Sequence, residues 1–148
     1  MIVRAATPDD YPALADLWFD SWMSIGIAND TDLPRDGVRA RFYEEVKARW
    51  RLLVAEEDGI LWGLMALVQS ESRIDQIFVA PAAKGSGIGR LLLDHAKSEF
   101  PNGVVLVTHT ENVRARAFYE HHGFVIERTE DDPVHRREKC HYAWRPKL

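Results

Sequence analysis

A glycine-rich run past the middle of the chain has the composition of an anion-binding turn. The run is Lys84-Gly85-Ser86-Gly87-Ile88-Gly89-Arg90, between an apolar stretch typical of a strand and a leucine-rich stretch typical of a helix. Glycine has no Cβ, so the backbone can turn tightly and approach an anion closely. The first N–H groups of a helix have no internal acceptor, and the helix dipole is positive there. The run therefore predicts a phosphate-binding site, to which Lys84 and Arg90 add positive charge.

Two other interpretations of this run stay open on its residues alone. One is a tight turn that holds no ligand. The other is a nucleotide site in a regulatory domain. The glycine spacing differs from the Gly-x-Gly-x-x-Gly dinucleotide pattern, and no Lys-Ser or Lys-Thr pair follows Gly89 as a P-loop requires. The spacing therefore argues against the nucleotide classes.

A second motif, over residues 112–124, combines a helix start, apolar helical positions and a helix stop. Asn112 is a favourable N-cap, and Gly123 is a favourable residue just past a helix end. The positions that share one side of the helix are Ala115, Phe118, Tyr119 and His122. Taken alone, these residues predict an amphipathic helix after a short apolar strand over 104–108.

Together the two motifs resemble the GNAT family of acyltransferases. The resemblance lies in residues 76–81, in the glycine-rich run, and in the Asn, Ala, Phe-Tyr and Gly-Phe positions of the second motif. Where this chain has Lys84 the family usually has Gln or Arg, so the charge of Arg is kept without its planar guanidinium. The resemblance implies an α/β (α+β) three-layer fold, with a central mixed, mostly antiparallel twisted sheet of about 6–7 strands flanked by about 4 helices. It also implies transfer of an acetyl group from acetyl-CoA, the co-substrate, to a primary amine of a small molecule or peptide by direct attack in a ternary complex.

The resemblance assigns acetyl-CoA contacts to particular residues. The backbone of residues 77–79 should contact the pantetheine arm as another strand would, and the N–H groups of residues 85–90 should hold the pyrophosphate. Asn112 should lie near the pantetheine and Tyr119 near the sulfur. The expected cofactor-binding residues are Ile77, Phe78, Val79, Lys84, Gly85, Ser86, Gly87, Ile88, Gly89, Arg90, Asn112 and Tyr119.

Tyr119 and Asp75 are the expected catalytic residues. A phenol near the sulfur could protonate the leaving thiolate, the alternative being that Tyr119 only packs. The acceptor amine must lose a proton, because a lysine-like amine has a pKa of about 10.4. Asp75 is the favoured base, since it should share a strand face with Ile77. His109 and Glu111 are the other candidates, and each of the three could instead be a structural or surface polar residue.

The acceptor is expected near the first two helices, their loop and the last strands. Trp18 and Trp22 could form an aromatic wall for a cation, and Asp30 could attract a cationic amine. His109, which follows the short apolar strand near the expected cofactor cleft, is a further candidate for the acceptor site. The competing interpretation gives the tryptophans a core role and makes Asp30 part of a solvated acidic loop.

Strand and helix signals place both motifs in a single domain over residues 1–148. The expected order is β-α-α-β-β-β-α-β-α-β-β. Thr7 and Pro8 start the first helix, as an N-cap and a first-turn proline. The last two strands are expected over 124–128 and 140–144, with a charged connection over 130–139.

Composition excludes several other classes. The net charge of -4 argues against a nucleic-acid partner, which would require a basic surface. Cys140 is the single cysteine and no signal-peptide pattern opens the chain, which together indicate a cytoplasmic protein. The apolar runs are too short for a membrane span, and the histidines lack metal-ligand spacing, so neither membrane nor metal is predicted.

Three points stay open on the sequence. The edge strands of the sheet must be covered or paired, which a homodimer would achieve. A non-catalytic acetyl-CoA-binding sensor would keep the same motifs. So would an acyltransferase that uses another acyl-CoA.

Overall fold

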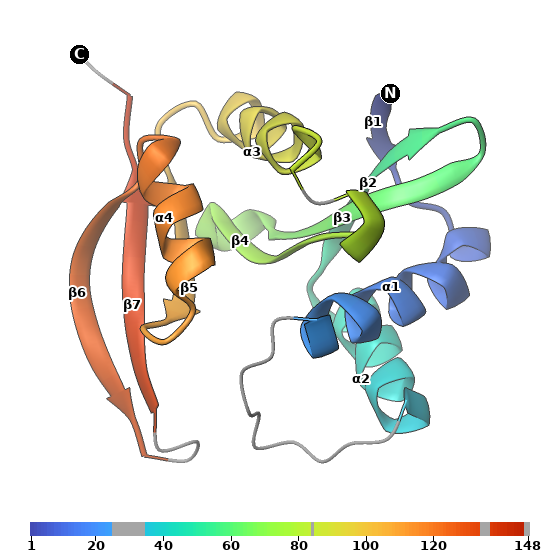
Figure 1. Cartoon of the computed structure of the whole chain (residues 1–148), viewed down its shortest axis with the longest axis horizontal. Helices are drawn as coiled ribbons and strands as arrows, with labels where there is room; N and C mark the ends of the chain where they lie inside the picture. The colour runs from blue at the N-terminus through green and yellow to red at the C-terminus, as the bar shows by residue number, and fades with distance from the viewer. Residues whose placement is uncertain (25–34, 84, 134–136, 147–148) are drawn as a thin grey trace.

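In the described part of the chain, seven strands form one sheet in the order β1-β2-β3-β4-β5-β7-β6, with four α-helices packed against it (Figure 1). The computed structural model describes residues 1–24, 35–83, 85–133 and 137–146. The strands are β1 (Ile2–Ala5), β2 (Arg51–Glu57), β3 (Ile60–Val68), β4 (Arg73–Val79), β5 (Val104–His109), β6 (Val125–Asp132) and β7 (Arg137–Trp144). The helices are α1 (Tyr11–Ser24), α2 (Arg35–Ala48), α3 (Ile88–Glu99) and α4 (Val113–His121). Within these residues no helix is both long and apolar enough to cross a bilayer.

The predicted order of elements and the predicted fold class are confirmed. Neighbouring strands are antiparallel except β4 and β5, which are parallel. Helix α3 lies on one side of β2–β4, and α1 and α2 lie on the other (Figure 1). The chain thus forms three layers, with a mixed and mostly antiparallel sheet in the middle.

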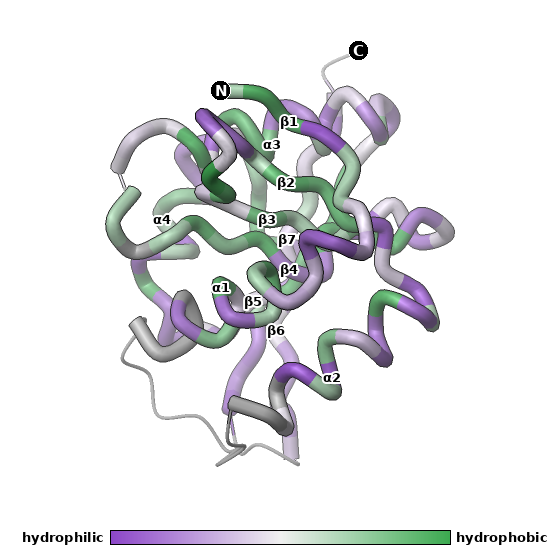
Figure 2. The backbone as a smooth tube through the Cα atoms, turned by 90° about the vertical axis from the view of Figure 1, so that its right-hand side faces the viewer, coloured by the Kyte–Doolittle hydropathy of each residue, from purple (hydrophilic) through white to green (hydrophobic). Residues whose placement is uncertain are grey.

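Two hydrophobic clusters hold the layers together. The first cluster joins α3 and α4 to the sheet and includes Leu92 and Tyr119. The second joins α1 and α2 to the opposite face and includes Leu14 and Phe42. Successive residues of β2 alternate between the clusters, as a strand buried on both faces requires. Figure 2 shows β2 and β3 as largely hydrophobic and most of β6 as hydrophilic.

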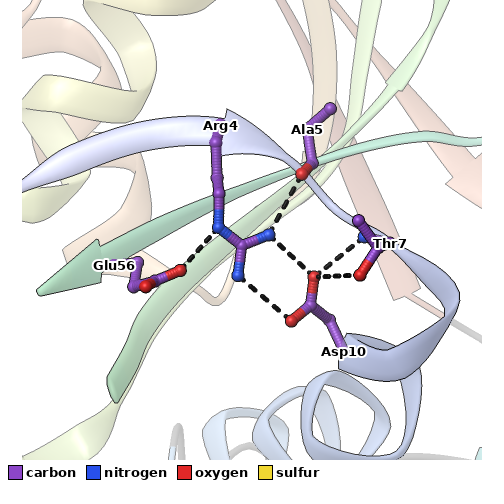
Figure 3. A network of polar contacts seen from close by, with 5 residues as sticks. All are labelled: Arg4, Ala5, Thr7, Asp10 and Glu56. Atoms are coloured by element: carbon purple, nitrogen blue, oxygen red, sulfur yellow. Dashed lines mark hydrogen bonds and ion pairs between the residues drawn. The ribbon is translucent and has the colours of Figure 1, made fainter. Parts of the chain in front are cut away.

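Arg4 on β1 joins three elements through its guanidinium (Figure 3). It donates to both carboxylate oxygens of Asp10, at 2.8 and 3.1 Å, and to Glu56 on β2 at 2.5 Å. Asp10 also accepts from the backbone N–H of Thr7 at 2.8 Å, which completes the helix start predicted there. The hydrogen bonds from Arg4, with those from Thr7, lower the pKa of Asp10 from 3.8 to about 2 although burial opposes this.

Asp10→Asn is expected to destabilise the fold by about 2 kcal/mol at pH 7, because one pKa unit corresponds to about 1.4 kcal/mol. A carboxylate with a lowered folded pKa stabilises the protein above its unfolded pKa of 3.8, and this contribution is lost as pH falls toward about 2. Urea unfolding of both proteins between pH 7 and pH 2 checks this, with the exposed neighbour Asp9→Asn as control. The difference between wild type and Asp10→Asn should shrink below pH 4, and a constant difference would contradict it.

The last two strands are longer than the sequence predicted. Residues 130–139, expected to be a connection, instead extend β6 to Asp132 and start β7 at Arg137. Cross-strand contacts stabilise this polar hairpin: Glu130 meets His141 at 3.1 Å and Asp132 meets Lys139 at 3.3 Å. Because polar residues dominate this part of β6, the apolar alternation that marks a half-buried strand is missing.

Candidate active site

Strands β4 and β5 separate at a bulge in β4. They pair only at Arg73 with Val105 and at Ile74 with Leu106. Asp75 is an extra residue in β4, because Ile74 and Gln76 pair with consecutive residues of β3. A bulge bends its strand and increases the local twist. We call the region beyond Ile74 and Leu106, where the two strands are no longer paired, the β4–β5 split.

The bulge also overturns the prediction that Asp75 and Ile77 share a strand face. Asp75 contacts Trp50, a member of the second cluster, whereas Ile77 packs against the first cluster. One inserted residue shifts the two-residue side-chain alternation, which the sequence pattern alone does not reveal. Asp75 therefore lies on the α1–α2 side of the sheet, and Ile77 lies on the α3–α4 side.

Asp75 is tied to the start of β2. Its Oδ2 accepts from the guanidinium of Arg49 at 2.8 Å and from the indole N–H of Trp50 at 2.7 Å. Arg49 also bonds Glu45 on α2 at 2.6 Å. These contacts fix the bulge relative to α2, and they leave Oδ1 as the carboxylate oxygen that no described side chain engages.

Residues 85–87 of the glycine-rich run form a turn that leads into the N-terminus of α3. Gly85 and Gly87 both have a φ of 88°, a left-handed conformation that favours glycine. A Cβ built on either would meet no heavy atom within 4 Å, so the backbone conformation and not crowding calls for glycine. Ser86 closes the turn, with its N–H and hydroxyl both donating to the carbonyl of Ala83. Ile88 opens α3, whose first N–H groups have no acceptor one turn earlier.

Gly89 also lies at a close contact between two helices. Gly89 does not have a positive φ, so its backbone does not call for glycine. A Cβ at this position would instead lie 2.8 Å from Cζ of Phe118 on α4. Gly89 is therefore the point at which α3 approaches α4 closely. This contact couples the two motifs recognised in the sequence.

Helix α4 brings Tyr119 into the first cluster. Asn112 caps the helix, since its Oδ1 accepts from the N–H of Ala115 at 3.2 Å. Tyr119 is 8% exposed, and its ring lies 5.9 Å from Phe124 and 6.2 Å from Tyr142 between centroids. Burial raises the pKa of Tyr119 above its usual value of 10. The phenol is thus kept in the protonated form that can donate a proton.

The side of β5, β7 and β6 that faces away from α4 carries several titratable groups, and we call it the open face. Tyr142 points into the first cluster, so His141 points the other way, and His109 does so by the same alternation from Leu106. Glu130 on β6 lies 3.1 Å from His141. Figure 1 shows α1 and α2 on the side of β2–β4 opposite α3.

The sequence did not identify the contact between His141 and Glu130. A signal for it was present: Arg128, Glu130 and Asp132 recur at every second position, the spacing of one face of a polar strand.

The structure brings together only part of the predicted site. The described members of the cofactor set lie on β4, on the turn before α3, in the first turn of α3 and at the start and middle of α4. Lys84 and Asp30 lie outside the described residues, as does the side chain of Trp22 in α1. Trp18 is a core residue, 8% exposed and packed edge-on against Trp50 at 5.5 Å, in agreement with the core interpretation.

The β4–β5 split and the N-terminus of α3 follow each other along the chain. A chain extended along β4 in the split could have an anionic end at the N-terminus of α3, a few residues farther along the sequence. Tyr119 lies on the α3–α4 side of the sheet, whereas Asp75 and the open face lie on the other side. A reaction at the split could therefore receive one partner from one side and release a leaving group on the other.

Comparison with known proteins gives consistent matches. A family model described as Acetyltransferase (GNAT) domain matches residues 31–137. An enzyme of Mycobacterium tuberculosis described as a probable N-acetyltransferase is 29% identical over 139 residues, covering 84% of this chain and 80% of the relative. The peptidyl-lysine N-acetyltransferase YiaC of Escherichia coli is 26% identical over 133 residues, covering 84% of each chain.

The solved structures share the fold. Apo-form YjaB from Escherichia coli superposes with a TM-score of 0.78 over 97% of this chain and 98% of that chain, at 23% identity.

Proposed function

The chain belongs to the GNAT acetyltransferase family, and from this premise we propose that it transfers the acetyl group of acetyl-CoA to a primary amine of a small molecule or peptide. The chain is an N-acetyltransferase, as its relatives are. The observation that carries the detailed proposal is the β4–β5 split beside the N-terminus of α3. There a thioester on an extended arm and its phosphates can be held together. We further propose that residues 1–148 act as one domain.

The acetyl-CoA contacts are proposed for the residues around the split. The N–H groups of residues 85–90 would hold the pyrophosphate, because Gly85 and Gly87 turn the backbone with open space where a Cβ would be. Beyond the bulge, the backbone of residues 77–79 would pair with the amides of the pantetheine arm as an added strand does. Asn112 would keep α4 in position as its cap.

In the proposed reaction the amine arrives on the α1–α2 side of the sheet and Tyr119 acts from the α3–α4 side. The neutral amine attacks the thioester carbonyl, and a backbone N–H of β4 within the split would stabilise the oxyanion. When the C–S bond breaks, the hydroxyl of Tyr119 would donate its proton to the thiolate. The burial that keeps this hydroxyl protonated supports the role. No covalent enzyme intermediate is needed.

Asp75 is retained as a candidate base through its Oδ1. Its position on the α1–α2 side agrees with an amine arriving there. Its Oδ2 already accepts two hydrogen bonds, which favours a positioning role for the bulge. Asp75→Asn would keep the shape of the side chain and test both roles at once.

The acceptor is proposed to be a primary amine that reaches the open face. One relative acts on peptidyl-lysine, which makes a lysine side chain a reasonable first probe. Trp18 contributes through the core that supports Trp50 and so Asp75.

The experiment is a thiol-release assay with acetyl-CoA and two amine probes, a lysine-containing peptide and putrescine. Release that depends on both protein and amine, with the acetylated amine found by mass spectrometry, is the expected result. Tight acetyl-CoA binding without release would favour the sensor alternative. Release with propionyl-CoA or succinyl-CoA but not with acetyl-CoA would favour another acyl donor.

A further inference from the structure

We propose that His141 removes the proton from the acceptor amine and that Glu130 orients the imidazole for this step. The inference rests on the proposed acetyl transfer and names a group for a role that the transfer requires. It also makes Asp75 a residue that positions β4.

His141 lies beside the β4–β5 split. His141 pairs with Val107, the first residue of β5 beyond the last pair with β4. Neighbouring strands lie about 4.8 Å apart, so His141 is one strand from the split. An amine at the split is then within reach of the ring, directly or through one water.

His141 lies on the side of the sheet opposite Tyr119. Its neighbours Cys140 and Tyr142 belong to the first cluster with Tyr119, so His141 points to the opposite side. Asp75 lies on that opposite side too. Proton removal from the amine and proton donation to the thiolate would therefore occur on opposite sides of the split, which matches an attack from one side and departure on the other.

His141 also contacts Glu130 on β6. Nε2 of His141 lies 3.1 Å from Oε1 of Glu130, and the His141 side chain is 20% exposed. A carboxylate that accepts from one ring nitrogen fixes the ring and leaves the other nitrogen to accept a proton. The hydrogen bond from His141 also lowers the pKa of Glu130, so this carboxylate stays ionised as the ring gains charge.

Other titratable or charged residues lie near His141 in register on β6, β7 and β5. Arg128 on β6 is opposite His141 in register. Lys139 on β7 is ion-paired with Asp132 at 3.3 Å, and His109 on β5 pairs with Lys139 in register. The hydrogen bond to Glu130 makes it the carboxylate in contact with the ring, so a proton accepted by His141 forms an ion pair there.

The reaction balances with these groups. The amine nitrogen forms a bond to the carbonyl carbon and gives one proton to His141. The C–S bond breaks, and the sulfur takes one proton from Tyr119. Solvent then returns the proton from His141 to Tyr119, so the products are the amide and free CoA thiol.

The test compares the pH dependence of kcat/KM for wild type, His141→Gln and Glu130→Gln, with the two amine probes used above. Wild-type activity should fall on the acid side as the base is protonated. His141→Gln should lose at least tenfold in kcat/KM and lose this acid limb, with acetyl-CoA affinity unchanged. Glu130→Gln should lower kcat/KM by less than His141→Gln does, because the imidazole remains but loses the carboxylate that orients it.

A matched control lies on α3. His95 is paired with Glu99 at 3.7 Å, away from the split, so His95→Gln should leave both the rate and the pH profile as in wild type. Glu130→Asp, which keeps a carboxylate, should restore most of the kcat/KM lost in Glu130→Gln.

The outcomes separate the inference from its premise. Wild-type rate and profile in His141→Gln, or loss of the acid limb in Asp75→Asn instead, would overturn the inference while transfer stands. No acetyl transfer by the wild-type protein to either probe would overturn the proposed function, and the inference with it.

Discussion

Gly87→Val is expected to weaken acetyl-CoA binding by about 100-fold, or about 3 kcal/mol. Gly87 has a φ of 88°, and a β-branched residue there is a conformational outlier. The turn before α3 must then change its backbone and withdraw N–H groups from the pyrophosphate. Each hydrogen bond to a charged group contributes about 1.5–3 kcal/mol, so the loss of one or two accounts for the effect. Calorimetric titration with acetyl-CoA measures it.

Gly59→Val supplies the matched control for this prediction. Gly59 has a φ of 77° in the turn between β2 and β3, and a Cβ there also meets nothing within 4 Å. The two variants carry similar backbone strain, but Gly59 is far from the split in the sheet. Gly59→Val should therefore lose stability and keep its affinity. Equal affinities for wild type and Gly87→Val would contradict the role of the glycine-rich turn.

Tyr119→Phe is expected to lower kcat by about 100-fold while acetyl-CoA affinity stays within twofold of wild type. The substitution removes the hydroxyl and keeps the ring, which packs in the first cluster. Within the described residues no side chain or backbone group hydrogen-bonds this hydroxyl, so its loss should not break a structural contact. Single-turnover kinetics separate the chemical step from product release.

The pH dependence gives Tyr119 a second test. Because burial raises its pKa above 10, wild-type kcat should show no loss from ionisation of this phenol below about pH 10. Tyr142→Phe is the matched control: its hydroxyl donates to Glu120 at 2.5 Å and accepts from Arg116 at 3.1 Å. That variant should lose stability and retain kcat. A kcat unchanged by Tyr119→Phe would contradict the catalytic role and leave Tyr119 with a packing role in the first cluster.

Local rules were sufficient for much of the fold. The N-cap at Asn112, the stop at Gly123 and the glycines before α3 each act within a few residues, and the structure has all three where the sequence indicates. The order of strands and helices followed from the same kind of local signal. The side of the sheet to which Asp75 points could not be predicted in this way. The bulge at Asp75 is fixed by pairing with β3 and by hydrogen bonds from Arg49 and Trp50, which are distant in sequence.

The residues of the predicted site also divide into those set by local sequence signals and those set by contacts distant in sequence. The turn before α3 and the helix that carries Tyr119 are continuous segments, so their residues could be proposed from spacing. The relation between Glu130 and His141 depends on the register of a polar hairpin, and no apolar alternation marks that register. The close contact between Gly89 and Phe118, a residue of the other motif, depends on how the two helices pack and could not be read from spacing.

The most direct measurement of the central claim is calorimetric titration of the purified protein with acetyl-CoA, with ATP and NAD as controls. The proposed site predicts micromolar binding of acetyl-CoA, about -8 kcal/mol, and no comparable binding of the two controls. No heat and no thermal shift with acetyl-CoA would contradict the account, and the glycine-rich run would then be only a tight turn.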